Sequence, residues 1–580
     1  MGWLMLTNFR WNSRLRSKSS LIALGLVVFC GTMIFAGNSL AGGSGGGPND
    51  IHLTITIAEG SQSVAILVGL AILIGVYVLI ITEVVHRTLA AAIGGFLAMM
   101  ALNYYSQEDV LNIIAVASMI DWETIGLLLG MMVMVGVMSH TGIFEWFAIQ
   151  AYKKSGGEVW TLVVILCVVT AILSAFLDNV TTMLLLTPVT IQLAKVLDLK
   201  PIPILIAEVL FSNIGGAATM IGDPPNIMIG AGLSPAAIQS KGYPDLADSG
   251  VTFLDFITEM GPGILMCVVP SFMLIKWLYR DEFIGTRERD VTELEKKYGI
   301  KDPQGLKVSG FILGLVIVGF FTHPITHIAV SYIALGGAVI MLLATNRHEL
   351  EEPLEHVEWT TLLFFAGLFV MVHSLQYIGV IDAIGVRVIS LIENFTDPTI
   401  QMAMAIIIVL WVSAIASAFI DNIPYTATMI PIVLQISETT GLELEPIIWA
   451  LAFGACLGGN GTLIGASANV VTAGMSEEAG YPISFNEFFK AGFPVMILTT
   501  FIVSIYMLLV YVVGADGGEL WVKVILIGIT IISIMLAVSR GKSKGQTIAE
   551  TFGESGLEDT VDAVKGIVEK VKGKGIDSEE

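Results

Sequence analysis

Long apolar runs separated by short polar breaks dominate the chain between residues 64 and 538. Each run approaches the roughly 20 residues that a helix needs to cross a bilayer. Residues 64–81, 88–105 and 124–139 predict the first three spanning helices. The complete pattern predicts an all-α polytopic membrane protein with about 11 to 13 transmembrane helices.

Composition supports this prediction and excludes several classes of protein. Of 580 residues, 55% are hydrophobic and 14% are charged, which excludes a soluble enzyme. Acidic residues outnumber basic ones by 50 to 29, giving a net charge of −21 that argues against a nucleic-acid partner. The sequence has no GxxxxGK[ST] phosphate-binding loop, so we expect no ATP-driven pump, and it has no CxxC motif, so we expect neither disulfides nor a zinc site. We expect no enzymatic activity and no cofactor other than Na⁺ or H⁺ as the coupling ion.

The two ends of the chain predict appendages to the membrane core. Residues 1–41 combine a basic region, an apolar stretch and small residues, as in a signal peptide cleaved after Ala41; an uncleaved first anchor is the alternative. Residues 42–62 predict a Gly-rich extracytoplasmic linker. An additional membrane helix at 519–538 precedes a charged cytoplasmic tail at 539–580.

Lysine and arginine placement predicts the orientation of the helices. Seven basic residues lie between 280 and 307, so we assign 281–307 as a cytoplasmic connector between a first transporter half, 63–280, and a second half, 308–513. The charge pattern holds only if 159–197 forms a re-entrant hairpin on the cytoplasmic side and 399–436 forms one on the outside. This topology predicts a bacterial inner membrane protein whose basic loops and tail are cytoplasmic.

An internal repeat links these two hairpins. SAFLDNVTTMLLLTPV at 174–189 matches SAFIDNIPYTATMIPI at 417–432, and GGAATMIGDPPN at 215–226 matches GGNGTLIGASAN at 458–469, both 243 positions apart. The matches fall on Asp, Asn, Gly, Thr and Pro rather than on common apolar residues. Two copies of opposite orientation, each with a hairpin and a broken helix, are typical of inverted-repeat transporters, which bind their substrates near the bilayer midplane.

Helix breaks at membrane depth leave backbone groups that ions, water or side chains must satisfy. Carboxylate, amide and hydroxyl oxygens there are ligands for a monovalent cation, and a carboxylate also carries a proton. The predicted binding residues are Asp178, Asn179, Thr181, Thr182, Gly222, Asp223, Asn226, Asp421, Asn422, Thr462 and Asn469.

Each of these residues also has a structural interpretation. Asp178 and Asp421 precede helices, where Asp is an ordinary N-cap. Asp223 has no acidic counterpart in the second copy, which makes it the strongest coupling or specificity residue, although it could also be a turn residue at the membrane edge. Glu208, matched by Leu451, would relay protons or pair with a nearby helix.

The motifs SAFLDNVTTMLLLTPVT and NIGGAATMIGDPPNIMIG resemble those of the arsenite permease and NhaD sodium:proton antiporter group of the ion transporter superfamily, especially the melanosomal P protein and its bacterial relatives. The resemblance covers roughly residues 64–513. It implies a membrane carrier with paired re-entrant hairpins, working as a homodimer by an elevator-like motion. Arsenite permeases carry a different hairpin tip, closer to Ala-Asn-Asp-Gly.

The sequence therefore predicts a secondary active ion transporter coupled to sodium, protons or both, similar to Na⁺/H⁺ antiporters. An arsenite, carboxylate or other anion permease is the leading alternative, because helix N-termini also bind anions. An anion channel for chloride is a further alternative. The predicted partners are the lipid bilayer, a small inorganic ion or anion, and a second copy of the chain.

Overall fold

The computed structural model describes residue 57 and residues 61–82, 84–106, 111–287, 299–326, 328–346, 350–515 and 517–543. Within these ranges the chain is helical and has no strand beyond two isolated bridges. Ten of the described helices are long and apolar enough to cross a membrane, and three shorter apolar helices accompany them. These observations confirm an all-α polytopic membrane protein.

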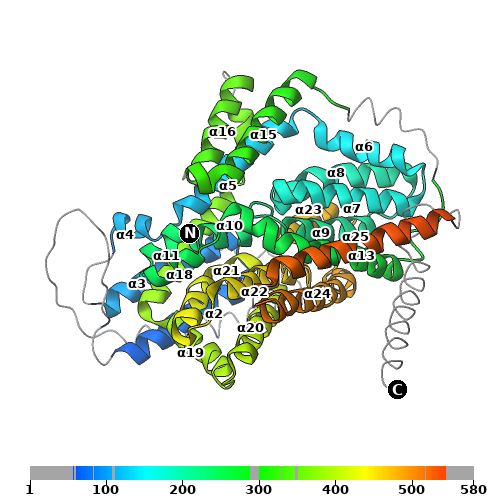
Figure 1. Ribbon diagram of the computed structural model, residues 1–580. Helices are drawn as coiled ribbons and strands as arrows, with labels where there is room; N and C mark the ends of the chain where they lie inside the picture. The colour runs from blue at the N-terminus through cyan, green and yellow to red at the C-terminus, as the bar shows by residue number, and fades with distance from the viewer. Residues whose placement is uncertain are drawn as a thin grey trace, which may run out of the picture. The chain divides into compact units, whose positions relative to one another are not determined.

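Most of the helices follow one another with short connections, whereas residues 279–302 separate α13 from α15 (Figure 1). In chain order they are α2 (Gln62–Thr82), α3 (Arg87–Tyr105), α4 (Ile113–Ser118), α5 (Trp122–Ser139), α6 (Ile143–Ser155), α7 (Val159–Phe176), α8 (Asn179–Leu197), α9 (Pro201–Gly216), α10 (Pro224–Gly232), α11 (Pro235–Ser240), η1 (Pro244–Ser249), α12 (Phe253–Asp255), η2 (Phe256–Met260), α13 (Gly261–Leu278), α15 (Pro303–Thr326), α16 (Val330–Thr345), α17 (Glu351–Glu355), α18 (Trp359–Ile378), α19 (Val380–Ile392), α20 (Pro398–Phe419), α21 (Asn422–Thr440), α22 (Leu444–Gly458), α23 (Ser467–Glu478), α24 (Phe485–Leu508), η3 (Leu509–Val513) and α25 (Glu519–Ser543). The segments η2 and η3 are π-helical turns that continue into α13 and out of α24.

Several predicted segments lie wholly or partly outside the described residues. These are the signal peptide at 1–41, most of the linker at 42–62, the middle of the connector at 281–307 and most of the tail at 539–580.

The chain forms two compact units, and the division falls inside α18 and again inside α19. The first unit comprises residues 1–120 and 367–383 and includes α2, α3 and α4. In it α3 packs closely on α18, because a Cβ added at Gly95 would lie 2.8 Å from the carbonyl oxygen of Gly367. A small residue is what permits this approach of the two backbones.

The second unit, residues 121–366 and 384–580, contains the hairpins and broken helices of both repeats. The two units therefore do not coincide with the predicted halves 63–280 and 308–513, which remain a prediction based on the repeat. Each hairpin is a pair of helices joined by a tight tip, α7 with α8 and α20 with α21. Each broken helix is also a pair, α9 with α10 and α22 with α23, separated by the glycine-rich motif.

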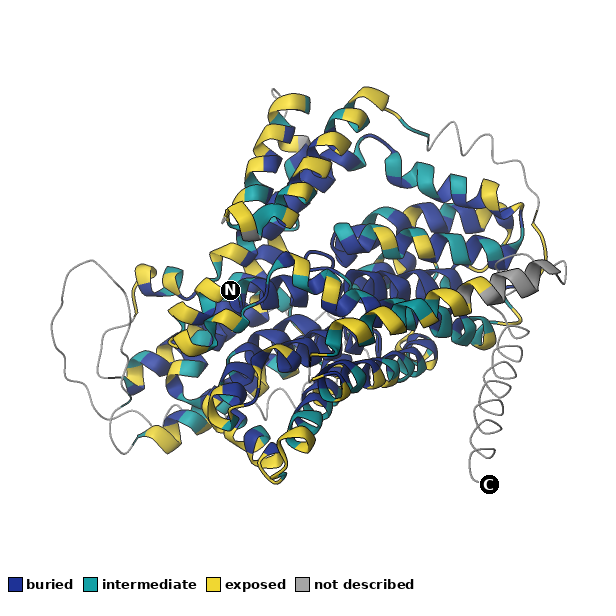
Figure 2. Cartoon of the chain, viewed as in Figure 1, coloured by how far each residue is buried: buried dark blue, intermediate teal, exposed yellow. Residues whose placement is uncertain are grey.

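The first helices of the broken pairs, α9 and α22, form the core of this unit. Almost every residue of both is buried, so they lie among other helices on all sides (Figure 2). A helix that is apolar all round has this location. It places the breaks at Ala217–Asp223 and Gly459–Ala466 in the interior of the protein.

Glycines in α9 and α22 allow the first helix of each hairpin to pack directly against the helix that precedes each break. A Cβ at Gly215 would lie 2.2 Å from Ala171 O, and one at Gly458 would lie 2.6 Å from Ala414 O. These pairs are equivalent in the repeat, since each member is 243 positions from its counterpart. The same backbone contact therefore joins α7 to α9 and α20 to α22.

Candidate functional site

A connected group of polar side chains occupies the breaks of both repeats. Its six members, which we call the asparagine cluster, are at most 2% exposed; they are Asn179, Asn213, Asp223, Asn422, Asn460 and Asn469. Asp223 is its single acid. The cluster thus places one carboxylate among five amides inside the protein.

Hydrogen bonds run through the cluster from one repeat to the other. Asn179 Nδ2 donates to Asp223 Oδ1 over 3.1 Å and also to Asn213 Oδ1 over 3.1 Å. Asn422 Nδ2 donates to the same oxygen of Asp223 over 3.3 Å. Asn213 Nδ2 in turn donates to Asn460 Oδ1 and Asn469 Oδ1, each over 3.0 Å. Both hairpin tips and both helix breaks therefore meet at one site.

Two oxygen atoms of the cluster accept no hydrogen bond within the described residues. They are Asp223 Oδ2 and Asn179 Oδ1, which belong to directly bonded residues and are buried. The hydroxyl of Thr182, on the first turn of α8, is also buried without a hydrogen-bond partner in the described residues. A buried polar atom without a partner is costly, so such atoms commonly mark a position that an ion or water fills.

Four helices begin at the cluster, and their N-terminal ends add partial positive charge. Asn179 and Asn422 are the first residues of α8 and α21, and Asp223 is the N-cap residue of α10. Asn469 lies in the first turn of α23. Together with the amide donors, these helix ends offset part of the cost of burying a charge on Asp223.

Asn226 and the cluster member Asn469 hold the breaks open by donating to backbone carbonyls. Asn226 Nδ2 donates to Ala217 O over 3.1 Å and to Thr219 O over 2.9 Å. In the second repeat Asn469 Nδ2 donates to Gly459 O over 2.8 Å and to Thr462 O over 3.0 Å. Asn226 thus serves the geometry of the break, and its Oδ1 accepts from the Cys456 thiol at 3.2 Å.

The threonines in the breaks have matching structural contacts. Thr219 Oγ1 donates to Ala175 O, and Thr462 Oγ1 donates to Ala418 O. Each bond fastens a break to the hairpin helix before its tip. Thr462, a predicted binding residue, therefore has its hydroxyl engaged in the repeat's structure.

The two hairpin-tip acids lie outside the chain of hydrogen bonds in the asparagine cluster. Asp178 is the N-cap of α8, and its two oxygens accept from the backbone N–H of Thr181 at 2.8 Å and from its hydroxyl at 2.5 Å. Asp421 caps α21 by accepting from Ile423 N at 3.0 Å, and its second oxygen accepts from Ser467 Oγ at 3.1 Å. Both acids have the capping geometry that the sequence offered as the structural interpretation, and Thr181 completes it in the first repeat.

Gly222 and Glu208 complete the set of predicted residues. A Cβ at Gly222 would lie 2.5 Å from Gly216 O and from Ser174 O, so the break requires glycine here. Glu208 is fully buried on α9, where Oε1 accepts from Thr190 Oγ1 at 3.0 Å and Oε2 has no hydrogen-bond partner in the described residues. No hydrogen bond in the described structure links Glu208 to the asparagine cluster.

Asn213 and Asn460 were missed among the predicted binding residues. Both flank the glycine pairs of the repeated motif, but Asn213 aligns with Cys456 and Asn460 with Ala217. A search for polar residues shared by both copies passes over them. Each is an amide in one copy of the repeated motif that aligns with a residue without an amide in the other copy. Asp223 was singled out by the same kind of difference between the copies.

This arrangement defines a class of protein. Many apolar helices, a repeated hairpin and broken helix, and a buried polar site where the copies meet are the features of a polytopic membrane transporter. The chain is a permease of this class rather than an enzyme.

The chain belongs to the citrate transporter family CitMHS, because the sequence pattern of that family matches residues 77–454. It is 40% identical over 525 residues to the P protein of Homo sapiens, an alignment covering 78% of this chain and 61% of that protein. The chain therefore spans less than two thirds of the length of the P proteins it matches. The predicted resemblance to the P protein and its bacterial relatives is confirmed.

Mycobacterial relatives match over nearly their whole length. A "46 kDa membrane protein" of Mycobacterium leprae is 38% identical over 450 residues, covering 77% of this chain and 99% of the relative. An uncharacterized transporter of Mycobacterium tuberculosis is 38% identical over 449 residues with the same coverage. Among solved structures, the YdaH transporter of Alcanivorax borkumensis matches with a TM-score of 0.48 and 13% identity, covering 75% of this chain and 99% of that one.

Proposed function

We propose that the protein is a secondary active transporter coupled to sodium, protons or both, and that these ions exchange at Asp223. The observation that carries this proposal is the open carboxylate oxygen of Asp223 beside the open carbonyl oxygen of Asn179, both buried. Oxygens of this kind bind hard monovalent cations, and a carboxylate holds a proton in their place. One buried acid with two alternative cations is the chemistry that an antiporter needs.

The contacts around Asp223 support a site that changes occupant rather than a fixed ion pair. Its neighbours are the neutral amides of Asn179 and Asn422 and the Cys456 thiol, and no cationic side chain bonds to it in the described structure. Amide donors and helix ends stabilise the carboxylate only in part, so a cation or a proton supplies the rest of its neutralisation. Asp178 and Asp421 then have supporting roles, because they shape the hairpin tips that deliver Asn179 and Asn422.

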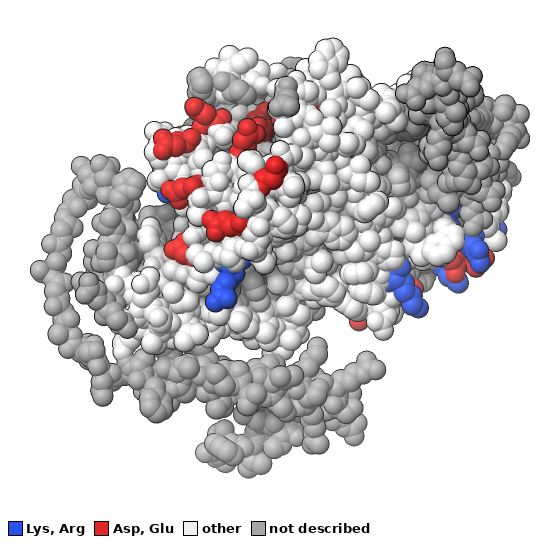
Figure 3. All heavy atoms as spheres, turned by 60° about the horizontal axis from the view of Figure 1, so that its bottom comes forward, with Lys and Arg blue, Asp and Glu red and all other residues white. Residues whose placement is uncertain are grey.

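The remaining details of the proposal follow from the repeat and the charge pattern. The two halves, 63–280 and 308–513, alternate access to Asp223 from opposite sides, and two copies of the chain form a homodimer in a bacterial inner membrane. Figure 3 shows acidic side chains gathered in one area of the surface with a basic side chain beside them, and other lysine and arginine side chains at another edge together with acidic ones. The basic loops and the tail would face the cytoplasm.

Reconstitution into liposomes containing a pH-sensitive dye tests the function. We expect Na⁺ or Li⁺ on one side to drive proton movement in wild type, and Asp223→Asn to abolish it. Asp245→Asn, at an exposed position of the short helix η1, is the matched control and is expected to keep wild-type flux. Full flux in Asp223→Asn, or voltage-driven chloride current without any need for Na⁺ or H⁺, would overturn the proposal.

Transport of a carboxylate is a second candidate, with arsenite or another anion as variants of it. It is favoured by the four helix N-termini at the cluster and by the family's description as citrate transporters. Adding citrate, chloride and arsenite in turn to the same liposomes separates the candidates. Citrate uptake that depends on Na⁺ or H⁺ would make the carboxylate the cargo and Asp223 its coupling residue.

A further inference from the structure

A second polar site lies between α25 and the π-helical turn η2, apart from the asparagine cluster. Lys523 of α25 forms an ion pair with Glu259 of η2, and the two side chains are only 11% and 10% exposed. Tyr511, from the other π-helical turn η3, donates its hydroxyl to the same carboxylate. Tyr506 OH donates to the backbone oxygen of Glu259 over 2.6 Å. π-Helical turns often mark functional sites, and here two of them converge on one ion pair.

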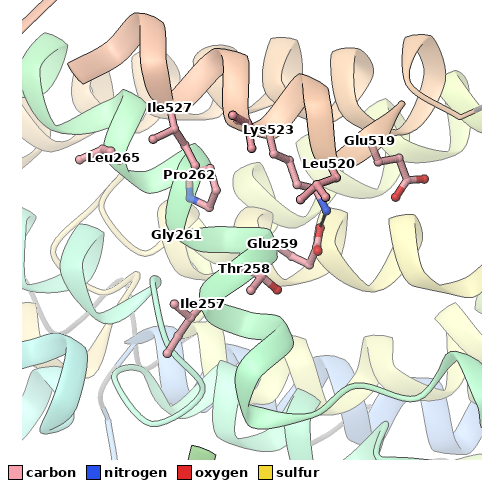
Figure 4. Close-up of a pocket in the computed structure, with 11 residues that line it drawn as sticks. Ile257, Thr258, Glu259, Gly261, Pro262, Leu265, Glu519, Leu520, Lys523 and Ile527 are labelled. Carbon is pink, nitrogen blue, oxygen red and sulfur yellow. Dashed lines mark hydrogen bonds and ion pairs between the residues drawn. The ribbon is translucent and has the colours of Figure 1, made fainter. Parts of the chain in front are cut away.

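A pocket of about 500 Å³ opens beside this pair (Figure 4). Figure 4 shows Lys523 reaching from α25 toward Glu259, with Glu519 and Leu520 nearby on the same helix. The pocket is lined by Ile257, Thr258, Glu259, Gly261, Pro262, Leu265, Glu519, Leu520, Lys523, Val524 and Ile527. Its lining is mostly apolar, with two carboxylates and one ammonium.

The charged groups of the pocket lie at one end of it, beside the apolar Ile257 and Leu520, and the other end is lined by apolar side chains. Glu519 and Lys523 lie in the first two turns of α25, and Glu259 lies near the start of the helical span Phe253–Leu278. Leu265 and Ile527 lie about one turn further along these helices. Trp521, on the first turn of α25, is 69% exposed, as tryptophans at a membrane interface commonly are. The polar end therefore lies at headgroup level and the apolar end at acyl-chain level.

The charges identify the headgroup that fits. Glu259 and Glu519 carry two negative charges against one positive charge on Lys523, so the pocket favours a ligand with a cationic group. Lys523 has three N–H donors, of which Glu259 uses one, so it can also donate to a phosphate. The alternative is that the ion pair only holds α25 against η2. That role would not account for the pocket beside the pair or for the second carboxylate, Glu519, in its lining.

We propose that this pocket binds a zwitterionic aminophospholipid of the phosphatidylethanolamine type. The primary ammonium lies against Glu519, the phosphate accepts from Lys523, and one acyl chain runs along Leu265, Val524 and Ile527. The bound lipid fixes α25 against the start of the span that contains Glu259. This site is independent of the ion that the protein moves.

Lipid binding to delipidated protein, measured by native mass spectrometry, tests the proposal without any transport assay. The probes are phosphatidylethanolamine, phosphatidylcholine and phosphatidylglycerol of identical acyl chains. We expect wild type to prefer phosphatidylethanolamine over phosphatidylcholine by about two- to fivefold, the value of one partly exposed charged contact. Glu519→Leu, which removes both the charge and the hydrogen-bond acceptor for the primary ammonium, is expected to remove this preference.

Val524→Trp fills the pocket and is expected to lose the bound lipid, whereas Ile525→Trp, equally exposed on the adjacent position but outside the pocket, keeps it. Ile527→Trp replaces Val524→Trp if the latter elutes as aggregate. Equal binding of the ethanolamine and choline lipids by wild type, tighter binding of phosphatidylglycerol, or an unchanged preference in both pocket-filling variants would overturn the proposal.

Discussion

The side-chain amide of Asn179 donates to Asp223 Oδ1 over 3.1 Å, joining the first residue of the hairpin helix α8 to the N-cap residue of the broken helix α10. The remaining oxygens of both groups, Asn179 Oδ1 and Asp223 Oδ2, are buried and accept nothing in the described structure. The bond therefore aligns two free oxygens at the meeting point of the repeats. A cation bound there would contact a hairpin and a break at once.

Close backbone packing at the two breaks predicts unequal tolerance to alanine. A Cβ at Gly222 would lie 2.5 Å from two carbonyl oxygens, whereas one at Gly465 would lie 2.8 and 3.0 Å from the equivalent pair. We expect Gly222→Ala to cost about 3 kcal/mol and Gly465→Ala about 1 kcal/mol, in the range of overpacked cores. Thermal unfolding in detergent measures both, with Gly474→Ala as a control because nothing lies within 4 Å of that Cβ. A larger loss for Gly465→Ala would contradict the geometry.

Asn226 and Asn469 are expected to matter equally for stability. Replacing either by alanine removes a donor from two buried carbonyl oxygens, at a cost of about 2–4 kcal/mol. Melting temperatures of the two variants should fall by similar amounts, while Asn394→Ala, on an exposed turn, leaves it unchanged. Unchanged melting of Asn226→Ala would show that water replaces the amide at the break.

Glu208 has a prediction that separates a proton carrier from a packing residue. Glu208→Gln keeps an oxygen for the Thr190 hydroxyl and so preserves the fold, but it cannot ionise. If Glu208 relays protons, Glu208→Gln should slow transport by about a hundredfold or more and remove most of its dependence on pH, because one step of proton transfer is lost. Glu438→Gln, on an exposed position, serves as the control. Wild-type rates across the pH range would assign Glu208 to packing alone.

Lys241, in a loop outside the spanning helices, predicts a rise of stability with pH. Burial lowers the pKa of its amine from 10.5 to about 8, and the charge of Asp121 opposes this shift. Between these two values the unfolded chain binds more protons than the folded one, so stability increases as the pH rises from 8 toward 10.5. The apparent melting temperature should show this increase in wild type and not in Lys241→Met.

Lys200 provides a control of opposite sign. Its hydrogen bond to Glu282, at 2.8 Å, raises the pKa of its amine. The contribution of this bond to stability is therefore present at neutral pH and is lost once the pH exceeds the pKa of Lys200 in the folded protein. Both side chains are substantially exposed, and the contribution is therefore small. If Lys200→Met and Lys241→Met changed the pH profile in the same direction, the assignment for Lys241 would be wrong.

The repeat revealed much of the site before any contact was visible. Matching residues 243 positions apart located both hairpin tips and both breaks, and the unmatched Asp223 proved to lie at their meeting point. The repeat alone does not show which of these side chains make their hydrogen bonds to neighbouring residues in the sequence. Asp178 finds Thr181 three residues later, so its carboxylate serves the helix end and not the cluster.

Contacts between distant segments were beyond the sequence for a different reason. Asn213 and Asn469 are 256 positions apart, and Glu259 and Lys523 are 264 apart, so only the packing of the helices pairs them. Asn213 has no amide match in the other repeat, since it aligns with Cys456. An unmatched polar residue of this kind becomes interpretable only once its three-dimensional partner is known.

Proton release on sodium binding tests the central role of Asp223 most directly. Purified protein in weakly buffered detergent solution is mixed with Na⁺ at a pH where transport is active, and the released protons are counted with a pH indicator. If the two cations compete for Asp223, wild type should release up to about one proton per chain and Asp223→Asn none. Equal release from the two proteins, or Na⁺ binding to wild type without release, would contradict exchange of sodium and protons at this carboxylate.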